Sequence, residues 1–254
     1  MVTGSVMEKK INKFLIISLI LGVLFGGAAY FFRNSPHASE AGGEFTFPPL
    51  EYLDIDLQRL GVELIPYDGE EIIVDYKNDR PLDMEVGDNT LTITESDDFI
   101  VSLFAGKRSE FGVKIYLPSK KYREITIYTA TGAVDVRGIE CQKLSAVTES
   151  GDINILDMSY LASLITTSGS IRADITDIVK DTDILNRSGD IELTLPPESS
   201  VAIDFRTKDG ECVTDMISGQ IYGDYVYAFN GGRRQISVTA EHGTFVFNEK
   251  GQED

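Results

Sequence analysis

Apolar and polar side chains alternate along residues 125–214 in a pattern that occurs five times. Each copy is centred on a Thr/Asn-x-x-Gly phrase, and successive glycines are 19, 18, 20 and 21 residues apart: Gly132, Gly151, Gly169, Gly189 and Gly210. In each copy the residues five and seven positions before the glycine, and two and four positions after it, are mostly apolar. The residue between the two members of each pair is mostly polar. This alternation predicts two half-buried strands joined by a turn at the glycine. The repeat predicts an all-β chain, a β-solenoid (β-helix) of about 18–21-residue coils.

The turn of each copy holds two special positions. We expect its glycine to have φ > 0, where a Cβ atom would be costly. Three residues earlier, the alternation points a Thr or Asn side chain inward: Thr129, Thr148, Thr166, Asn186 and Thr207. Equivalent residues of stacked coils lie about 4.8 Å apart. We therefore expect these polar side chains to form a ladder in which they hydrogen-bond one another.

The flanks of the repeats are rich in strand patterns but less regular. The predicted order of the β domain is N-terminal coils and cap, regular repeats, C-terminal cap and charged tail, at residues 45–118, 119–215, 216–247 and 248–254. Residues 236–247 flank Gly243 as a degenerate copy and are interpreted as the terminal coil. Four nearby aromatic residues either close the end of the core or form a carbohydrate-stacking surface: Tyr222, Tyr225, Tyr227 and Phe229.

The N-terminal part of the chain has the pattern of a membrane anchor. Residues 14–32 are uncharged and mostly apolar, which is about the length that spans a bilayer. Lysines precede this run, so we expect residues 1–13 in the cytoplasm, one transmembrane helix as a signal anchor, a linker at 33–44, and an extracytoplasmic domain at 45–247. The predicted location is the cell membrane, with a single pass. A signal peptide cleaved after Ala38 or Ala41 is the alternative.

The charge of the chain limits its partners. Lys and Arg total 23 against 41 Asp and Glu, a formal net charge of −18. Nucleic acid and anionic lipid headgroups are excluded as expected partners, because both are bound by basic patches. The acidic surface either serves solubility or binds a cationic partner such as a cationic peptide, a cell-wall polymer or an envelope protein.

The residues that commonly carry catalysis do not form a recognisable set. His37 lies in the linker and His242 in the degenerate copy, so neither supports a catalytic triad. Cys141 and Cys212 lack the paired ligands of a zinc site. Cys212 replaces an apolar residue of the repeat and Cys141 falls elsewhere in the coil, so we expect no disulfide between them. No catalytic, cofactor-binding or metal-binding residue is predicted, and we do not expect an enzyme.

Acidic residues after the repeat glycines are the nearest approach to a cation site. They lie on neighbouring coils and could bind Ca²⁺ along one edge: Asp135, Asp152, Asp190 and Glu211. The tandem Gly-Gly-x-Gly-x-Asp pattern of calcium-binding β-rolls is absent, however, and Ser170 interrupts the row. Asp and Glu at these positions are also ordinary turn residues. A pectate-lyase-like enzyme would need clustered carboxylates, a cationic partner and long loops, and the short coils leave little room for them.

Several segments together resemble a known family. These are Leu53–Leu57, Val62–Leu64, Thr90–Ile93, Val113–Pro118, the Ser-Gly-Asp-Ile steps at Ser150 and Ser188, and the turn at Gly231-Gly232 before the last strands. In order and spacing they resemble the LiaG-like "putative adhesin" family of bacterial β-strand-repeat proteins of unknown function, over about residues 45–247. The resemblance implies a β-solenoid, often membrane-anchored and sometimes associated with envelope stress. The chain departs from the repeat at Ala133 and Ser170, where the Asp is missing.

These observations favour one function over two others. The leading hypothesis is a membrane-anchored, extracytoplasmic β-solenoid that acts as a non-catalytic binding, adhesin-like or envelope-stress-associated module. The first alternative is a structural scaffold that assembles through its open β edges. The second is a polysaccharide-active β-helix enzyme.

Overall fold

The structure of the chain is a computed structural model, and it describes residues 42–77, 81–95, 112–159, 161–214 and 220–250. Contacts divide the chain into residues 1–37 and 38–254, and every described residue belongs to the second unit. The predicted cytoplasmic segment, anchor and most of the linker lie outside the described residues. Among the residues that the structure describes, no helix has the length and apolar character needed to cross a membrane.

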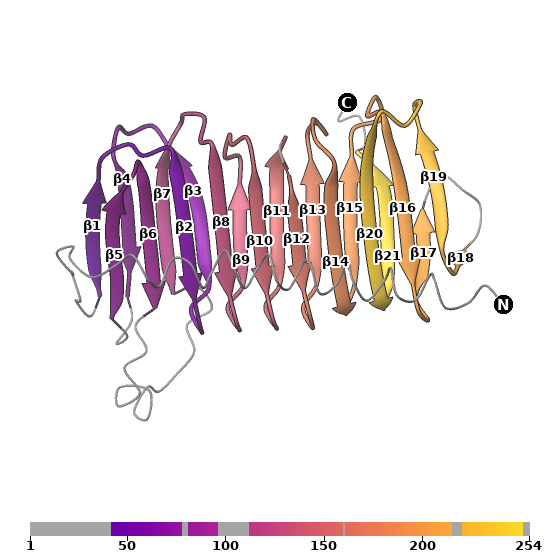
Figure 1. Cartoon of the computed structure of the whole chain (residues 1–254), viewed down its shortest axis with the longest axis horizontal. Coiled ribbons are helices and arrows are strands. Elements are labelled where there is room, and N and C mark those ends of the chain that lie inside the picture. Colours follow the sequence, from indigo (N-terminus) through magenta and orange to yellow (C-terminus); the bar gives the residue numbers. More distant parts are fainter. Residues whose placement is uncertain (1–41, 78–80, 96–111, 160, 215–219, 251–254) are drawn as a thin grey trace. The chain divides into compact units, whose positions relative to one another are not determined.

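The described residues form strands in two sheets, and the predicted all-β class is confirmed (Figure 1). Sheet A has ten strands in the spatial order β19 (Tyr225–Phe229), β16 (Val201–Thr207), β20 (Arg234–His242), β14 (Thr182–Ser188), β12 (Ser163–Thr166), β10 (Leu144–Thr148), β8 (Glu124–Thr129), β2 (Tyr52–Leu57), β6 (Thr90–Glu95) and β5 (Leu82–Gly87). Sheet B has eleven, in the order β1 (Gly43–Phe47), β4 (Ile72–Tyr76), β7 (Val113–Pro118), β3 (Val62–Tyr67), β9 (Val134–Arg137), β11 (Ile153–Met158), β13 (Ile171–Ile175), β15 (Ile191–Leu195), β21 (Thr244–Glu249), β17 (Glu211–Thr214) and β18 (Gln220–Tyr222).

Each regular coil gives one strand to sheet A and the next strand to sheet B. Neighbouring coils pair in parallel and in register. Matching inward positions on four consecutive strands are occupied by Ile127, Ala146, Leu164 and Ile184. Alternate residues of each strand are buried, as the sequence pattern predicted. The inward side chains of both sheets form one continuous apolar core. The rings of Phe205 in sheet A and Phe245 in sheet B, for example, stack with centroids 5.3 Å apart.

The polar ladder inside the turns exists, but its hydrogen bonds differ from the prediction. Thr148 Oγ1 accepts a hydrogen bond from Gly151 N of its own turn (2.8 Å) and donates one to Gly132 O of the preceding coil (3.4 Å). Thr166 makes the same pair of bonds to Gly169 N and Gly151 O. The expected Thr-to-Thr pairing is therefore wrong, because each hydroxyl is closer to two backbone groups that would otherwise be buried without a partner.

The repeat glycines are required for a reason other than the predicted positive φ. Among the five, only Gly189 has a left-handed φ, of 150°. A Cβ atom on Gly151 would lie 1.8 Å from the carbonyl oxygen of Gly132, and one on Gly169 would lie 2.0 Å from that of Gly151. The prediction of φ > 0 is thus wrong for four of the five glycines. Glycine is needed because the stacked turns approach each other so closely.

The two ends of the stack do not follow the sequence order. β20 and β21 lie between the coil β14–β15 and the coil β16–β17, pairing in parallel with both. Residues 236–247 are therefore an inner coil, and the prediction that they form the terminal coil is wrong. The outermost position belongs to β18 and β19, which run antiparallel to β17 and β16. A coil from later in the sequence can pack its apolar side chains against the same neighbours. The alternation alone therefore does not predict the order of the coils.

The N-terminal end has a matching arrangement. The first coil, β2–β3, lies between β8–β9 and the later coil β6–β7. β5 and β4 cover this outer coil by pairing antiparallel to β6 and β7, and β1 pairs with β4 at the edge of sheet B. Antiparallel strands thus end the stack on both sides, which limits further parallel stacking of coils.

Candidate functional site

The outer face of sheet A carries a stripe of apolar side chains. Four half-buried residues occupy one register position on the adjacent strands β8, β10, β12 and β14; this apolar stripe is Tyr128, Val147, Ile165 and Leu185. Parallel strands place such residues about 4.8 Å apart. Outward positions of a sheet that faces water are normally polar, so four consecutive apolar residues form a feature that the fold itself does not require.

A row of hydroxyl and carboxylate side chains runs parallel to the apolar stripe. It lies two residues earlier on each strand and extends onto β2; this polar row is Asp54, Thr126, Ser145, Ser163 and Asp183. Partial burial and the nearby Glu124 carboxylate raise the pKa of Asp54. The larger cause is loss of hydration of the Asp54 carboxylate, with repulsion by Glu124 second, and a cation bound beside Asp54 would favour its charged form.

The first residue of the stripe is held in place by a turn. The Tyr128 hydroxyl donates a hydrogen bond to Glu149 Oε1 at 3.1 Å. Burial and this carboxylate raise the pKa of Tyr128 to about 12, so the phenol remains neutral at physiological pH. The ring therefore presents an oriented, uncharged surface at one end of the stripe. At the other end Thr239 of β20 and Arg206 of β16 follow Leu185 in the register, and the row becomes polar.

The outer face of sheet B has a different character. Its central row is largely charged, and several charges are paired across neighbouring strands. Lys114 Nζ lies 2.9 Å from Glu63 Oε2, and Arg172 Nε lies 3.5 Å from Glu192 Oε2. Near the C-terminal end Lys250 Nζ lies 3.1 Å from Asp174 Oδ1. Ion pairs also occur on sheet A, for example between Lys143 and Glu124, so it is the apolar stripe that makes sheet A the better candidate surface.

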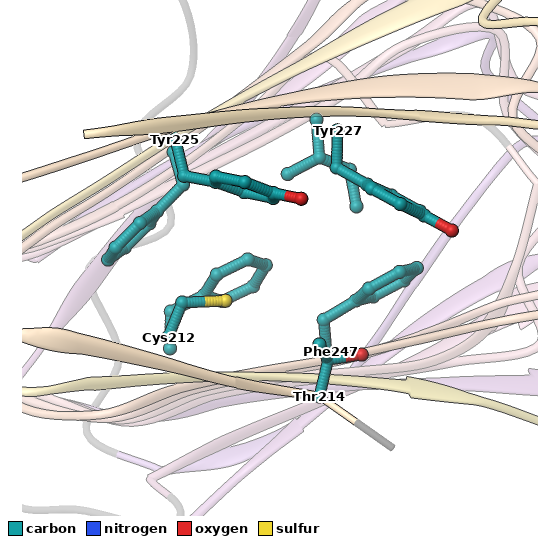
Figure 2. A pocket seen from close by; sticks show the side chains of 8 residues that line it. Cys212, Thr214, Tyr225, Tyr227 and Phe247 are labelled. Carbon is teal, nitrogen blue, oxygen red and sulfur yellow. The ribbon is translucent and has the colours of Figure 1, made fainter. Parts of the chain in front are cut away.

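A small apolar pocket opens between the sheets at the C-terminal end of the stack. Tyr225 and Tyr227 of β19 lie over one side, while Cys212, Thr214 and Phe247 lie on the opposite side (Figure 2). The space measures about 300 Å³ including the part open to solvent, and the other lining residues are Ile203, Phe205 and Phe245. Burial raises the pKa of the Cys212 thiol to about 11, so it stays a neutral apolar group.

The aromatic residues near this pocket divide into two groups. Tyr225 and Tyr227 are partly buried against the core, as expected for residues that close its end. Tyr222, in contrast, is 72% exposed and faces solvent. The backbone of Phe229 lies in β19, and its side chain is outside the described part. The expectation of a core-closing role is therefore confirmed for Tyr225 and Tyr227.

Two of the four acidic residues considered for calcium bond backbone amides at the turns, and the other two lie in strands. Asp152 Oδ1 accepts a hydrogen bond from Ser170 N at 2.7 Å, and Asp190 Oδ1 accepts one from Thr244 N at 2.9 Å. Each carboxylate thereby caps a backbone amide of the neighbouring coil. Asp135 and Glu211 lie in strands β9 and β17. Within the described ranges, no group of three or more His, Cys, Asp or Glu residues is arranged to hold a metal ion.

His242 and the two cysteines are the described members of the histidine and cysteine set. His242 Nδ1 contacts Asp209 Oδ1 at the surface, and His37 lies outside the described residues. Cys141 and Cys212 are buried free thiols in the described structure. Burial raises the pKa of Cys141 to about 12, so this thiol also remains protonated. Both described cysteines are thus buried, protonated thiols rather than accessible thiolates.

The apolar stripe was not singled out from the sequence, although a signal for it was present. Its four members all lie four residues before a repeat glycine, where the alternation calls for an outward side chain. The fifth copy has Arg206 at this position. The inward positions form the core, so their apolar pattern can be seen within a single copy. The outward positions show their pattern only when the copies are aligned and compared with each other.

Comparison with known proteins gives a family and a fold. The profile described as Toastrack DUF4097 matches residues 50–167 and again residues 123–246. A solved structure described as a "putative cell adhesion protein" from Clostridium sporogenes is 16% identical, with a TM-score of 0.51, covering 82% of this chain and 100% of its own. A "putative adhesin" from Bacteroides fragilis is 11% identical with a TM-score of 0.34, over 85% of this chain and 98% of its own. No curated protein gives a significant match.

Proposed function

This chain belongs to the Toastrack DUF4097 family, and from that premise we propose that it is a non-catalytic module that binds a partner on the outer face of sheet A. The observation that carries the proposal is the in-register apolar stripe beside the polar row. The description of the structural neighbour from Clostridium sporogenes, a "putative cell adhesion protein", is consistent with a binding role.

The chemistry of this face favours an amphipathic cationic peptide. Val147, Ile165 and Leu185 offer apolar contact, while Asp54 and Asp183 offer carboxylates one row away. Two residues along a strand correspond to about 6.6–6.8 Å, a separation that neighbouring apolar and basic side chains of one peptide can match. Binding would remove apolar surface from water and pair the acidic groups with lysine or arginine.

We further propose that residues 14–32 anchor the chain in the cell membrane and that the β domain faces the outside of the cell. The support is the uncharged run with lysines before it. Intact cells that express the full chain with a C-terminal tag provide the test. External protease should remove the tag, and the chain should remain in the membrane fraction after an alkaline wash. A tag protected from protease, or release by the wash, would contradict this topology.

The binding proposal is tested with the full chain and a fluorescent amphipathic cationic peptide. The double variant Val147→Ser/Ile165→Ser should weaken binding about tenfold or more, because two apolar contacts are worth roughly 1 kcal/mol or more each. Val246→Ser is the matched control, since Val246 is a half-buried apolar residue on the outer face of sheet B. Affinity should be unchanged in this control.

Salt and a second ligand separate the competing explanations. Peptide binding that uses the apolar stripe should persist at physiological salt, whereas binding by net charge alone should be lost. Equal affinity of the double variant and the control would refute the sheet A surface. If purified cell wall, and not the peptide, binds in a stripe-dependent way, the surface stands and its ligand is a wall polymer.

A further inference from the structure

The C-terminal edge of sheet A has an unusual composition for an edge strand. β19 is the last strand of the sheet and, among the described strands, pairs only with β16. Its five residues, Tyr-Val-Tyr-Ala-Phe, carry no charge. The edges at the other end carry Asp83 and Glu85 in β5 and Glu44 in β1. Charges on edge strands discourage pairing with another chain. At the C-terminal end this protection is missing from β19 and from the three-residue β18 of sheet B, and β19 is the longer of the two.

The sequence of β19 complements itself in antiparallel pairing. With Tyr227 at the centre, a second β19 would place Tyr227 opposite Tyr227 and Val226 opposite Ala228. Residue 225 would then face residue 229. We propose that β19 binds β19 of a second copy of this chain, forming a twofold-symmetric dimer through a continuous sheet A. Both members of each pair lie on the same face of the sheet, as antiparallel register requires.

Apolar surface left open on both faces of β19 supports this arrangement. Val226, on the outer face, is 67% exposed, although it is a large apolar residue in a strand. Tyr225 and Tyr227, on the inner face, border the open apolar pocket. A second β19 would set Ala228 beside Val226 and a second tyrosine pair beside the pocket. One edge-to-edge contact would therefore cover apolar surface on both faces.

The charges next to β19 are compatible with this contact. Asp204 on the neighbouring strand β16 forms a two-bond ion pair with Arg206, at 2.7 and 3.1 Å. Asp224, directly before β19, accepts a hydrogen bond from Thr207 N and leaves one further acidic charge beside the edge. The net charge of −18 still opposes association of two copies at long range. Association should consequently increase as salt rises from about 0.05 M to about 0.3 M, which shortens the screening length.

Cross-linking of the full chain tests the predicted register. Tyr227→Cys places two thiols opposite each other across the twofold axis, within the separation of a disulfide. Mild oxidation should convert most of this variant to a covalent dimer. Val86→Cys is the control, because Val86 is also an exposed apolar residue in an edge strand, β5, and should not cross-link. Cys212 lines the same pocket as Tyr227, so both variants are made in a Cys212→Ser background, and Cys141 is buried.

A second variant guards against accidental collision. Val226→Lys adds a charge to the edge on the solvent side, where the side chain has room. In the background of Tyr227→Cys it should reduce the cross-linked fraction at least tenfold, whereas Val86→Lys in that background should leave it unchanged. Circular dichroism confirms that each variant is folded. The proposal is overturned if Tyr227→Cys stays monomeric, if Val86→Cys cross-links equally well, or if Val226→Lys has no effect.

Discussion

At the residue scale, four of the five repeat turns are held by a threonine or asparagine that hydrogen-bonds both its own turn and the neighbouring coil. Thr148 shows this most clearly, since its hydroxyl bonds both Gly151 N and Gly132 O while completely surrounded by protein. A buried backbone group without a partner costs more than an average hydrogen bond contributes. The ladder therefore stabilises both the turn and the stacking of one coil on the next.

Thr148→Val tests this double role. Valine has nearly the same shape but leaves Gly151 N and Gly132 O without the hydroxyl, so the free energy of unfolding should fall by about 1–3 kcal/mol. Thr148→Ser keeps the hydroxyl and should cost clearly less. Urea denaturation of both variants provides the measurement. Equal losses would show that the methyl group, rather than the hydrogen bonds, gives this position its importance.

Gly151→Ala tests the close approach of neighbouring turns. The new Cβ atom would lie 1.8 Å from the backbone oxygen of Gly132. A backbone atom cannot rotate away as a side chain can, so the stacked turns must shift. We expect a loss of at least about 3 kcal/mol, at or beyond the upper end of ordinary overpacking. Gly87→Ala is the control, because nothing lies within 4 Å of its Cβ position. Thermal unfolding distinguishes them, and a harmless Gly151→Ala would show that the turns can separate.

Asp54→Asn tests whether the charged carboxylate of Asp54, which is partly buried, destabilises the folded protein. Burial and Glu124 raise the pKa of Asp54 in the folded state. The folded protein thus binds this proton more tightly than the unfolded chain, so ionisation of Asp54 disfavours folding above its raised pKa. Asp54→Asn should be more stable than the native protein at pH 7, and its advantage should shrink as pH falls through that pKa. The exposed Asp68→Asn should show little difference.

A pH titration of unfolding free energy provides the comparison for both aspartate variants. An advantage of Asp54→Asn that grows on acidification would contradict the sign of the raised pKa. The same result would remove the argument that this face seeks a cation. Because each variant is compared with the native protein at the same pH, titration of the many other carboxylates largely cancels.

At the element scale, the strands could be predicted from the sequence but their neighbours could not. Alternation shows which residues of 182–186 face inward, and the structure confirms those positions. The coil that stacks on this strand is a separate question, because 203–205 and 236–238 offer equivalent inward apolar residues. Chain continuity favours the nearer segment, yet β20 occupies the place beside β14. Either segment could pair with β14, and nothing in the sequence near β14 shows which one does.

The threading of the C-terminal coils can be tested by engineered disulfides. Asp183 lies directly opposite Ser237 in the parallel pair β14–β20. Adjacent strands lie about 4.8 Å apart, so Asp183→Cys/Ser237→Cys should form a disulfide. Asp183→Cys/Asp204→Cys should not, because β20 separates β14 from β16. Mass spectrometry after oxidation reads out both pairs, and the reverse result would restore stacking in sequence order.

The candidate surface was only partly predictable for a related reason. The acidic composition predicts cationic partners as a class, and this stays a prediction, but composition does not show where on the surface they would bind. The apolar stripe depends on Tyr128, Val147 and Ile165 falling on adjacent strands in register. That register follows from the equal length of successive coils, which the glycine spacing does indicate. The sequence therefore contained the stripe, whereas the pocket under Tyr225 and Tyr227 depends on the unforeseen order of the last coils.

At the scale of the whole described body, coils contact mainly their immediate neighbours along one continuous core. Stability in such a stack is approximately the sum of the coils and the interfaces between them. The position of a defect should then decide how far its effect spreads. A defect at an end loosens one interface, whereas a defect in the middle weakens the connection between two halves. A globular core with contacts in all directions would not make this distinction.

Leu164→Ala and Leu82→Ala compare the two positions. Both side chains are fully buried, Leu164 in the central strand β12 and Leu82 in the edge strand β5. Each truncation should cost about 2–5 kcal/mol locally. Hydrogen exchange should then show Leu82→Ala lowering protection mainly in β5 and β6, while Leu164→Ala lowers it in β10, β12 and β14. Leu164→Met, which preserves volume, should largely retain protection. A uniform loss across all strands in both variants would mean that the body unfolds as one unit, and the nearest-neighbour account of its stability would fail.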